Sequence, residues 1–184
     1  MTEKIMIASD IHGSAYWCEK LLKAYEREAP ETLLLLGDIL YHGPRNELPD
    51  GYAPKKVFAM LNPLKEKILC VRGNCDGEVD QMVLEFPVLA DYAMLYACKT
   101  KLYATHGHLA GESNPPPLSS GDVLLNGHTH VPCHKRLAGG ILYVNCGSVA
   151  LPKENTPHSY LVLENGAFRW VNLENGETFD VCEL

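Results

Sequence analysis

The stretch TLLLLGD, residues 32–38, is a continuous apolar run that stops at a glycine, which is typical of a strand buried on both faces. A second apolar run, residues 4–9, precedes it, and the segment 14–29 between them has apolar residues at helical spacing. Ser14 is placed to cap this helix and Pro30 to end it. The order strand, helix, strand predicts the α/β class for this half of the chain.

The rest of the chain is predicted to be rich in strands. A long Gly- and Pro-containing loop at 37–53 is followed by a short helix at 54–61 and a third strand at 67–71. After a short helix at 78–84, strands are predicted at 88–96, 101–105, 123–126, 132–136, 141–145, 160–164, 168–173 and 178–181. Asn165-Gly166 and Asn175-Gly176 predict type I′ hairpins in a carboxy-terminal antiparallel meander.

The length predicts one domain over residues 1–184. An α/β first half joined to a β-rich second half predicts two sheets stacked face to face with helices outside. Hydrophobic residues make up 46% and charged residues 21% of the chain, which excludes disorder, collagen and coiled coil. An antiparallel carboxy-terminal edge would offer strands for pairing, so a homo-oligomer stays open.

Charge and hydropathy exclude several classes of function. Sixteen Lys and Arg against 23 Asp and Glu give a net charge of −7 without a basic run, so long nucleic acid is not an expected partner. The apolar runs are too short to span a membrane, and the start of the chain lacks the apolar region of a signal peptide. Seven scattered cysteines without a CxxC pair favour reduced thiols, so we expect a cytoplasmic location.

Side chains of the types that bind metals directly follow five predicted strands. They stand in the motifs DIH at 10–12, GD at 37–38, GN at 73–74, HGH at 106–108 and GHTH at 127–130. Because the carboxyl ends of strands meet in one crevice of an α/β sheet, we expect these motifs to converge. Side chains two apart in an extended segment point to the same side, which predicts that Asp10 with His12, and His128 with His130, face one site.

The donor set points to transition metals. The seven donors are Asp10, His12, Asp38, Asn74, His106, His128 and His130. Imidazole, carboxylate and amide ligands without thiolate favour Mn²⁺, Fe²⁺, Zn²⁺ or Ni²⁺ over Ca²⁺ or an iron–sulfur cluster. Seven donors are more than one ion needs, so we expect two divalent ions that share Asp38. Two such ions outweigh the charge of Asp10, Asp38 and a bridging hydroxide, which leaves a site suited to an anionic phosphate.

The order and spacing of these motifs over residues 5–148 resemble the calcineurin-like metallophosphoesterases. The longer forms GNCD at 73–76, THGH at 105–108 and GDILYHGPRN at 37–46, with the short chain, resemble the small bacterial phosphodiesterases of that superfamily. The resemblance implies a four-layer α/β/β/α sandwich, in which helices cover both outer faces of two stacked mixed β-sheets. It also implies a small phosphodiester as substrate.

The resemblance further implies two ligand sets. The first ion would take Asp10, His12, Asp38 and His130, and the second Asp38, Asn74, His106 and His128. A metal-bound hydroxide would attack the phosphorus while both ions stabilise the developing charge. The catalytic residues expected on this basis are Asp38, Asn74, His106 and His108. Mn²⁺ is the expected metal, with Zn²⁺, Fe²⁺ and Ni²⁺ as alternatives.

The chain departs from the phosphatase branch of the superfamily at Cys75. Those enzymes carry GNH where this chain has GNC, and the histidine is their candidate acid for the leaving group. A thiol, with an ordinary pKa of about 8.5, donates a proton less readily near neutral pH. This favours small or activated phosphodiesters. The motif GDxxDRG is also absent, and His42, Arg45 and Cys75 are predicted to shape the substrate rim, with Arg45 able to bind phosphate oxygens.

Two other functions stay open. A phosphomonoesterase would use the same metals but needs a better proton donor than Cys75. A non-catalytic scaffold, as the retromer subunit of this superfamily is thought to be, would tend to lose a ligand, whereas all seven donors are present.

The role of His108 also has alternatives, because this residue could be a hydrogen-bond donor behind the ligands or a proton shuttle.

Overall fold

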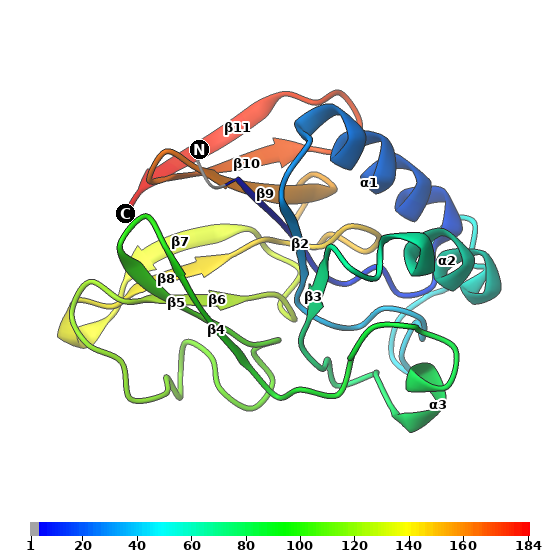
Figure 1. Ribbon diagram of the computed structural model, residues 1–184, viewed down its shortest axis with the longest axis horizontal. Coiled ribbons are helices and arrows are strands. Elements are labelled where there is room, and N and C mark those ends of the chain that lie inside the picture. The colour runs from blue at the N-terminus through cyan, green and yellow to red at the C-terminus, as the bar shows by residue number, and fades with distance from the viewer. Residues whose placement is uncertain (1–3) are drawn as a thin grey trace.

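Two β-sheets packed face to face form the centre of the protein in a computed structural model that describes residues 4–184 (Figure 1). The first sheet has the order β11-β10-β9-β1-β2-β3. Its strands are β1 (Ile5–Ala8), β2 (Thr32–Leu35), β3 (Ile68–Cys70), β9 (Ser159–Glu164), β10 (Ala167–Asn172) and β11 (Thr178–Glu183). Strands β1, β2 and β3 are parallel, and β9, β10 and β11 form the predicted antiparallel meander beside β1.

The second sheet has the order β4-β5-β6-β8-β7. Its strands are β4 (Ala93–Ala97), β5 (Thr100–Ala104), β6 (Val123–Asn126), β7 (Cys133–Arg136) and β8 (Leu142–Asn145). Strands β5, β6 and β8 are parallel, whereas β4 and β7 pair antiparallel at the two edges. Both sheets are therefore mixed, as expected.

The faces that the sheets turn toward each other are apolar. Leu34 of β2 and Trp170 of β10 share one core cluster with Leu125 of β6 and Val144 of β8, and all four are fully buried. Burial of one such side chain contributes about 1.5–3 kcal/mol to folding. Strands that are covered on both faces, such as β1 and β2, consequently show the continuous apolar runs seen in the sequence.

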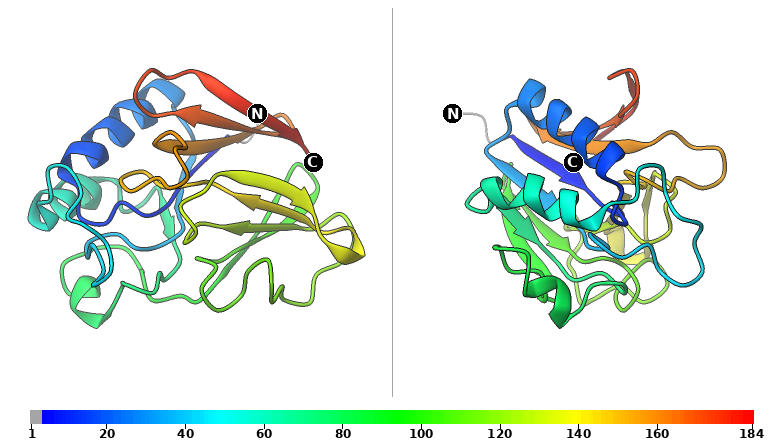
Figure 2. Two further views of the ribbon diagram at one scale, coloured as in Figure 1. Left: turned by 180° about the vertical axis from the view of Figure 1, so that it is seen from behind. Right: turned by 90° about the vertical axis from the view of Figure 1, so that its right-hand side faces the viewer.

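Helices α1 (Ala15–Glu28) and α2 (Pro54–Leu61) cover the outer face of the six-stranded sheet (Figure 2). The Ser14 side chain caps α1 by accepting the N–H of Trp17 at 3.2 Å, as expected, and Ala29 ends it in a left-handed conformation. The remaining helices are short: α3 (Glu78–Gln81), η1 (Asn62–Leu64) and η2 (Ala138–Gly140).

The fold class is confirmed, but the outer face of the five-stranded sheet differs from the expected helical layer. Within residues 4–184, a loop covers it, and Leu118 of that loop packs against Leu124 and Tyr143. The loop contains Pro115-Pro116-Pro117, whose rings fix φ and leave three residues without an N–H for a helical ladder.

Two local expectations were wrong. The strand predicted at 88–96 begins only at Ala93 (β4, Ala93–Ala97), and the N–H of Val88 donates to the Gln81 side chain and not to a strand. Asn165 and Gly166 both have positive φ (54° and 79°) and form the predicted tight turn, but Asn175 does not lie in that region. Its side chain instead accepts the N–H of Glu177 at 2.9 Å within a longer loop.

None of the helices in the described residues is long and apolar enough to cross a membrane.

Candidate metal centre

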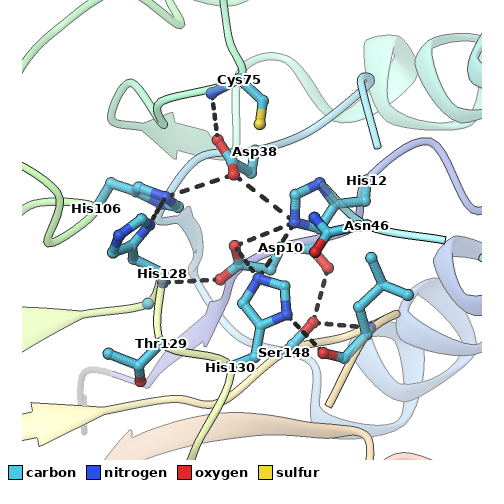
Figure 3. Close-up of polar contacts among 12 residues, drawn as sticks. Asp10, His12, Asp38, Asn46, Cys75, His106, His128, Thr129, His130 and Ser148 are labelled. Carbon is cyan, nitrogen blue, oxygen red and sulfur yellow. Dashed lines mark hydrogen bonds and ion pairs between the residues drawn. The ribbon is translucent and has the colours of Figure 1, made fainter. Parts of the chain in front are cut away.

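Side chains of four of the five motifs meet at one site (Figure 3), and Asn74 of the fifth motif contacts His106 there. The turns after β1, β2 and β3 bring Asp10, His12, Asp38 and Asn74 to this site, and the turns after β5 and β6 bring His106, His128 and His130. Parallel strands place their carboxyl ends on the same side, so residues more than one hundred positions apart meet here.

Strand alternation, the expected reason why Asp10 with His12 and His128 with His130 would face one site, is wrong, because these residues do not have extended backbone. Five of the donors have positive φ: Asp10 (60°), His12 (48°), Asp38 (54°), His128 (65°) and His130 (63°). A non-glycine residue in this region costs of the order of 1 kcal/mol, and such residues cluster at functional sites. Tight left-handed turns, rather than strand alternation, therefore aim these side chains inward.

The first group of possible metal ligands consists of three atoms, one each from Asp10, His12 and His130. Asp10 Oδ1 lies 3.1 Å from His130 Nε2 and 3.4 Å from His12 Nε2, and the two Nε2 atoms are 3.3 Å apart. The three residues are at most 3% exposed. The Asp10 Oδ1 atom has no hydrogen-bond donor within residues 4–184.

Backbone carbonyl groups fix the tautomers of three histidines. His12 Nδ1 donates to Tyr41 O at 2.8 Å, and His106 Nδ1 donates to Leu36 O at 2.7 Å. His130 Nδ1 donates in the same way to a backbone carbonyl of residue 151. Because a carbonyl only accepts, Nδ1 carries the proton in the neutral form of each ring, and Nε2 of that form presents a lone pair to the centre. Lone pairs and a carboxylate oxygen that face one another without a proton fit a cation.

A second donor group adjoins the first through Asp38. The Oδ2 atom of Asp38 lies 3.7 Å from His12 Nε2 and 3.5 Å from His106 Nε2. His106 Nε2 in turn lies 3.1 Å from Asn74 Oδ1 and 3.2 Å from His128 Nδ1. One carboxylate oxygen therefore faces a histidine of each group, and the donors fit two divalent cations.

Buried hydrogen bonds hold the two turns that carry Asp38 and Asn74. The carboxylate of Asp76 accepts the N–H groups of Asp38, Ile39 and Gly73 at 2.7–2.8 Å. Burial raises the pKa of Asp76 to about 6. The three N–H donors favour the ionised form and so lower the pKa, but burial outweighs them. Gly73 approaches Asp38 so closely that a Cβ there would collide with the Asp38 carboxylate.

Electrostatics favour an ionised Asp10 in the first group and a neutral His128 ring in the second. Burial alone would raise the pKa of Asp10, but the rings of His12 and His130, when they are protonated and donate to its carboxylate, hold it well below its usual range. Burial and then the neighbouring His106 lower the pKa of His128, which keeps its ring neutral near pH 7.

An open cleft of about 470 Å³ lies over the donors. Of the predicted rim residues, Arg45 and Cys75 line it. His42 does not, because its ring packs between Tyr41 and Tyr52 at centroid distances of 4.8 and 5.3 Å.

His108 also lies outside the lining, although its ring centroid is 5.4 Å from that of His106. Burial and then His106 lower its pKa.

A larger hollow of about 670 Å³ between α1 and α2 contains none of the predicted site residues.

Three polar side chains that line the cleft were not predicted as site residues: Asn46, Thr129 and Lys153. Asn46 and Thr129 stand beside recognised motif residues, and that adjacency was the available signal. Lys153 lies in the segment after β8 and had no signal, because only the folded chain brings it near His130, whose carbonyl accepts the Lys153 N–H at 3.2 Å.

Comparison with known proteins places this geometry in context. Residues 4–166 match the calcineurin-like phosphoesterase superfamily domain. The chain is 46% identical over 172 residues to the phosphodiesterase YfcE of Escherichia coli K12, covering 94% of this chain and 93% of that protein. A solved structure of the E. coli phosphoesterase YfcE superposes with a TM-score of 0.94 at 44% identity, covering 98% of each chain. Vps29 from Entamoeba histolytica, solved with Zn²⁺, shares the fold alone, with a TM-score of 0.63, 18% identity and 98% coverage of both chains.

Proposed function

The chain belongs to the calcineurin-like phosphoesterase superfamily and is a phosphoric diester hydrolase, and we propose that it cleaves small or activated phosphodiesters at two divalent metal ions. The observation that supports two ions most directly is the position of Asp38 Oδ2, within 3.7 Å of a histidine nitrogen of each donor group. The unpartnered Asp10 Oδ1 supports a cation in the first group.

The proposed ligand sets are those implied by the family resemblance. Asp10, His12, Asp38 and His130 would hold one ion, and Asp38, Asn74, His106 and His128 the other. When bound, such ions supply Lewis acidity for phosphoryl oxygens and lower the pKa of water. Mn²⁺ is our proposal for the metal, with Zn²⁺, Fe²⁺ and Ni²⁺ as alternatives, since imidazole, carboxylate and amide donors without thiolate suit all four.

The chain's own groups orient this chemistry. The carbonyl partners of His12, His106 and His130 hold each neutral ring in the tautomer with its proton on Nδ1, which leaves Nε2 as the atom that can bind a ligand. The Cys75 N–H donates to Asp38 Oδ1 at 2.8 Å, which leaves Oδ2 to face both groups. We assign His108 to an auxiliary role beside His106, because it lies outside the cleft lining.

The residue at position 75 favours diesters over alkyl monoesters. Burial and then Asp38 raise the pKa of Cys75 to about 12, so its thiol is a weak acid at neutral pH. An activated leaving group departs without protonation, whereas a poor one needs a proton donor. Cys75 lines the cleft where such a donor would act. Because its thiol is a poor proton donor, a phosphomonoesterase ranks second to a phosphodiesterase.

A scaffold role has less support. The Vps29 fold likeness at 18% identity concerns the fold alone, and all seven donors of this chain lie at one site. The proposal also includes a single domain over residues 1–184, of which 1–3 lie outside the described residues, and a cytoplasmic location. A homo-oligomer remains an open part of it.

Hydrolysis of bis(p-nitrophenyl) phosphate beside p-nitrophenyl phosphate tests the proposal. The assay uses metal-stripped protein with Mn²⁺ added back, and both substrates share one leaving group. We expect faster turnover of the diester and only with metal. Faster turnover of the monoester would favour the phosphomonoesterase, and binding of metal without turnover of either would favour the scaffold.

A further inference from the structure

The walls of the cleft carry two cationic side chains that the metal centre does not use. Arg45, from the loop after β2, and Lys153, from the segment after β8, both line the cleft. Neither forms an ion pair with an acid in the described part of the chain. On a protein of net charge −7, unpaired cations beside a site mark a local field of the opposite sign.

The cleft holds almost no negative charge to balance them. Asp38 is the one acidic residue that lines it among residues 4–184, and Asp38 already faces both donor groups. The other lining side chains near the cations are the amide of Asn46 and the hydroxyl of Thr129. Thr129 Oγ1 accepts from Asn145 Nδ2 at 3.1 Å, which leaves its O–H free to donate to an anion.

This positive charge exceeds what the reacting group needs. A phosphodiester carries one negative charge, and two divalent ions already outweigh Asp10, Asp38 and a bridging hydroxide by one charge, before Arg45 and Lys153 are counted. A cleft of about 470 Å³ falls within the range of small-molecule sites, so it has room for an arm of the substrate as well as its phosphate.

We propose that Arg45 and Lys153 bind a second anionic group, a carboxylate or phosphate, on the arm of a small phosphodiester that stays in the cleft during hydrolysis. The inference rests on the proposed diesterase function and specifies its substrate class. Water adds to phosphorus, the alcohol of the other arm leaves with a proton, and the monoester product retains the anionic arm. Arg45 contributes two parallel N–H donors, which match a carboxylate or phosphate edge.

Three substrates with one leaving group test this charge selection: p-nitrophenyl esters of ethyl phosphate, 2-carboxyethyl phosphate and phosphorylcholine, with neutral, anionic and cationic arms. The readout is the ratio of kcat/KM for the anionic arm to that for the neutral arm, with Mn²⁺ present. We expect a ratio of about five or more in the wild type and a ratio below one for the cationic arm. The preference should shrink at about 1 M salt, where the screening length falls to about 3 Å.

Two neutral variants assign the preference to these side chains. Arg45→Gln and Lys153→Gln should each lower the ratio about threefold, as expected for exposed charge pairs. Lys67→Gln is the matched control, because Lys67 is exposed and precedes β3 at the opposite end of the sheet. The double variant Arg45→Glu/Lys153→Glu should reverse the preference toward the cationic arm.

A wild-type ratio near one, or a ratio that both glutamine variants retain, would overturn the inference. Equal losses on the neutral and anionic substrates would also overturn it, because they would place the cations on the reacting phosphate. Failure of the proposed function looks different, since none of the three esters would then release p-nitrophenolate when metal is added.

Discussion

The carboxylate of Asp76 accepts the backbone N–H of Asp38 at 2.7 Å, and both side chains are buried. Asp38 has a φ of 54°, a conformation that persists only where its surroundings hold it. The same carboxylate accepts the N–H of Gly73, so it joins the turn after β2 to the turn after β3. Asp76 is therefore a positioning residue for the Asp38 side chain, which faces both donor groups.

Asp76→Asn should destabilise the protein and weaken metal binding together. An amide has one acceptor oxygen for the three N–H groups, and a buried donor without an acceptor costs about 1–3 kcal/mol. Urea unfolding of the metal-free protein and Mn²⁺ titration measure the two effects. Asp91→Asn, which removes an exposed partner of Arg72, should cost less than about 1 kcal/mol. Equal unfolding free energies in the two variants would refute the role of Asp76.

Cys75 should react slowly with alkylating reagents in spite of its place in the cleft. Burial and then Asp38 raise its pKa to about 12, and the thiolate is the reactive form. In metal-free protein treated with iodoacetamide at pH 8, peptide mass spectrometry should find the exposed Cys98 modified well before Cys75. Modification of Cys75 at the rate of Cys98 would show that its thiol is ionised.

Cys75→His should shift activity toward monoesters. The change places an imidazole at the cleft beside Asn74, where it can protonate a leaving group near neutral pH. The ratio of alkyl monoester to bis(p-nitrophenyl) phosphate turnover should rise about tenfold or more, within the usual range for general acid catalysis. Cys75→Ser, which adds no acid of suitable pKa, is the control and should leave that ratio low.

Metal removal should lower stability as well as activity. Ligands that bind only the folded state stabilise it by about 2.7 kcal/mol at one hundred times Kd. Mn²⁺ should therefore raise the Tm of stripped protein, and a chelator should reverse the change. In Asp10→Asn, the first donor group loses its carboxylate, and the Mn²⁺-dependent rise in Tm should shrink. A rise as large as that of the wild type would remove Asp10 from the ligands.

Much of the fold follows from local signals in the sequence. The apolar run of β2 and the Ser14 cap of α1 fix strand and helix with little help from distant residues. The segment before β4 could not be predicted, because its bonding depends on the Gln81 side chain. The loop that covers the five-stranded sheet could not be predicted from sequence patterns either, because Leu118 packs there against residues of two strands distant in sequence.

The donors of the candidate site were predictable, but their geometry was not. The convergence of Asp38 and His106 follows from the carboxyl ends of strands, whichever conformation the turns adopt. No sequence pattern predicts the left-handed turns at Asp10 and His12, because residues other than glycine rarely adopt this conformation. Lys153 reaches the cleft only through tertiary structure.

The number of Mn²⁺ equivalents required for diester hydrolysis tests the central claim most directly. Metal-free protein, at a concentration well above the metal Kd, is titrated with Mn²⁺ while turnover of bis(p-nitrophenyl) phosphate is followed. Two ions that share Asp38 predict a plateau at about two equivalents per chain, and loss of that plateau in Asp38→Asn. A plateau at one equivalent, or turnover that persists without metal, would contradict the account.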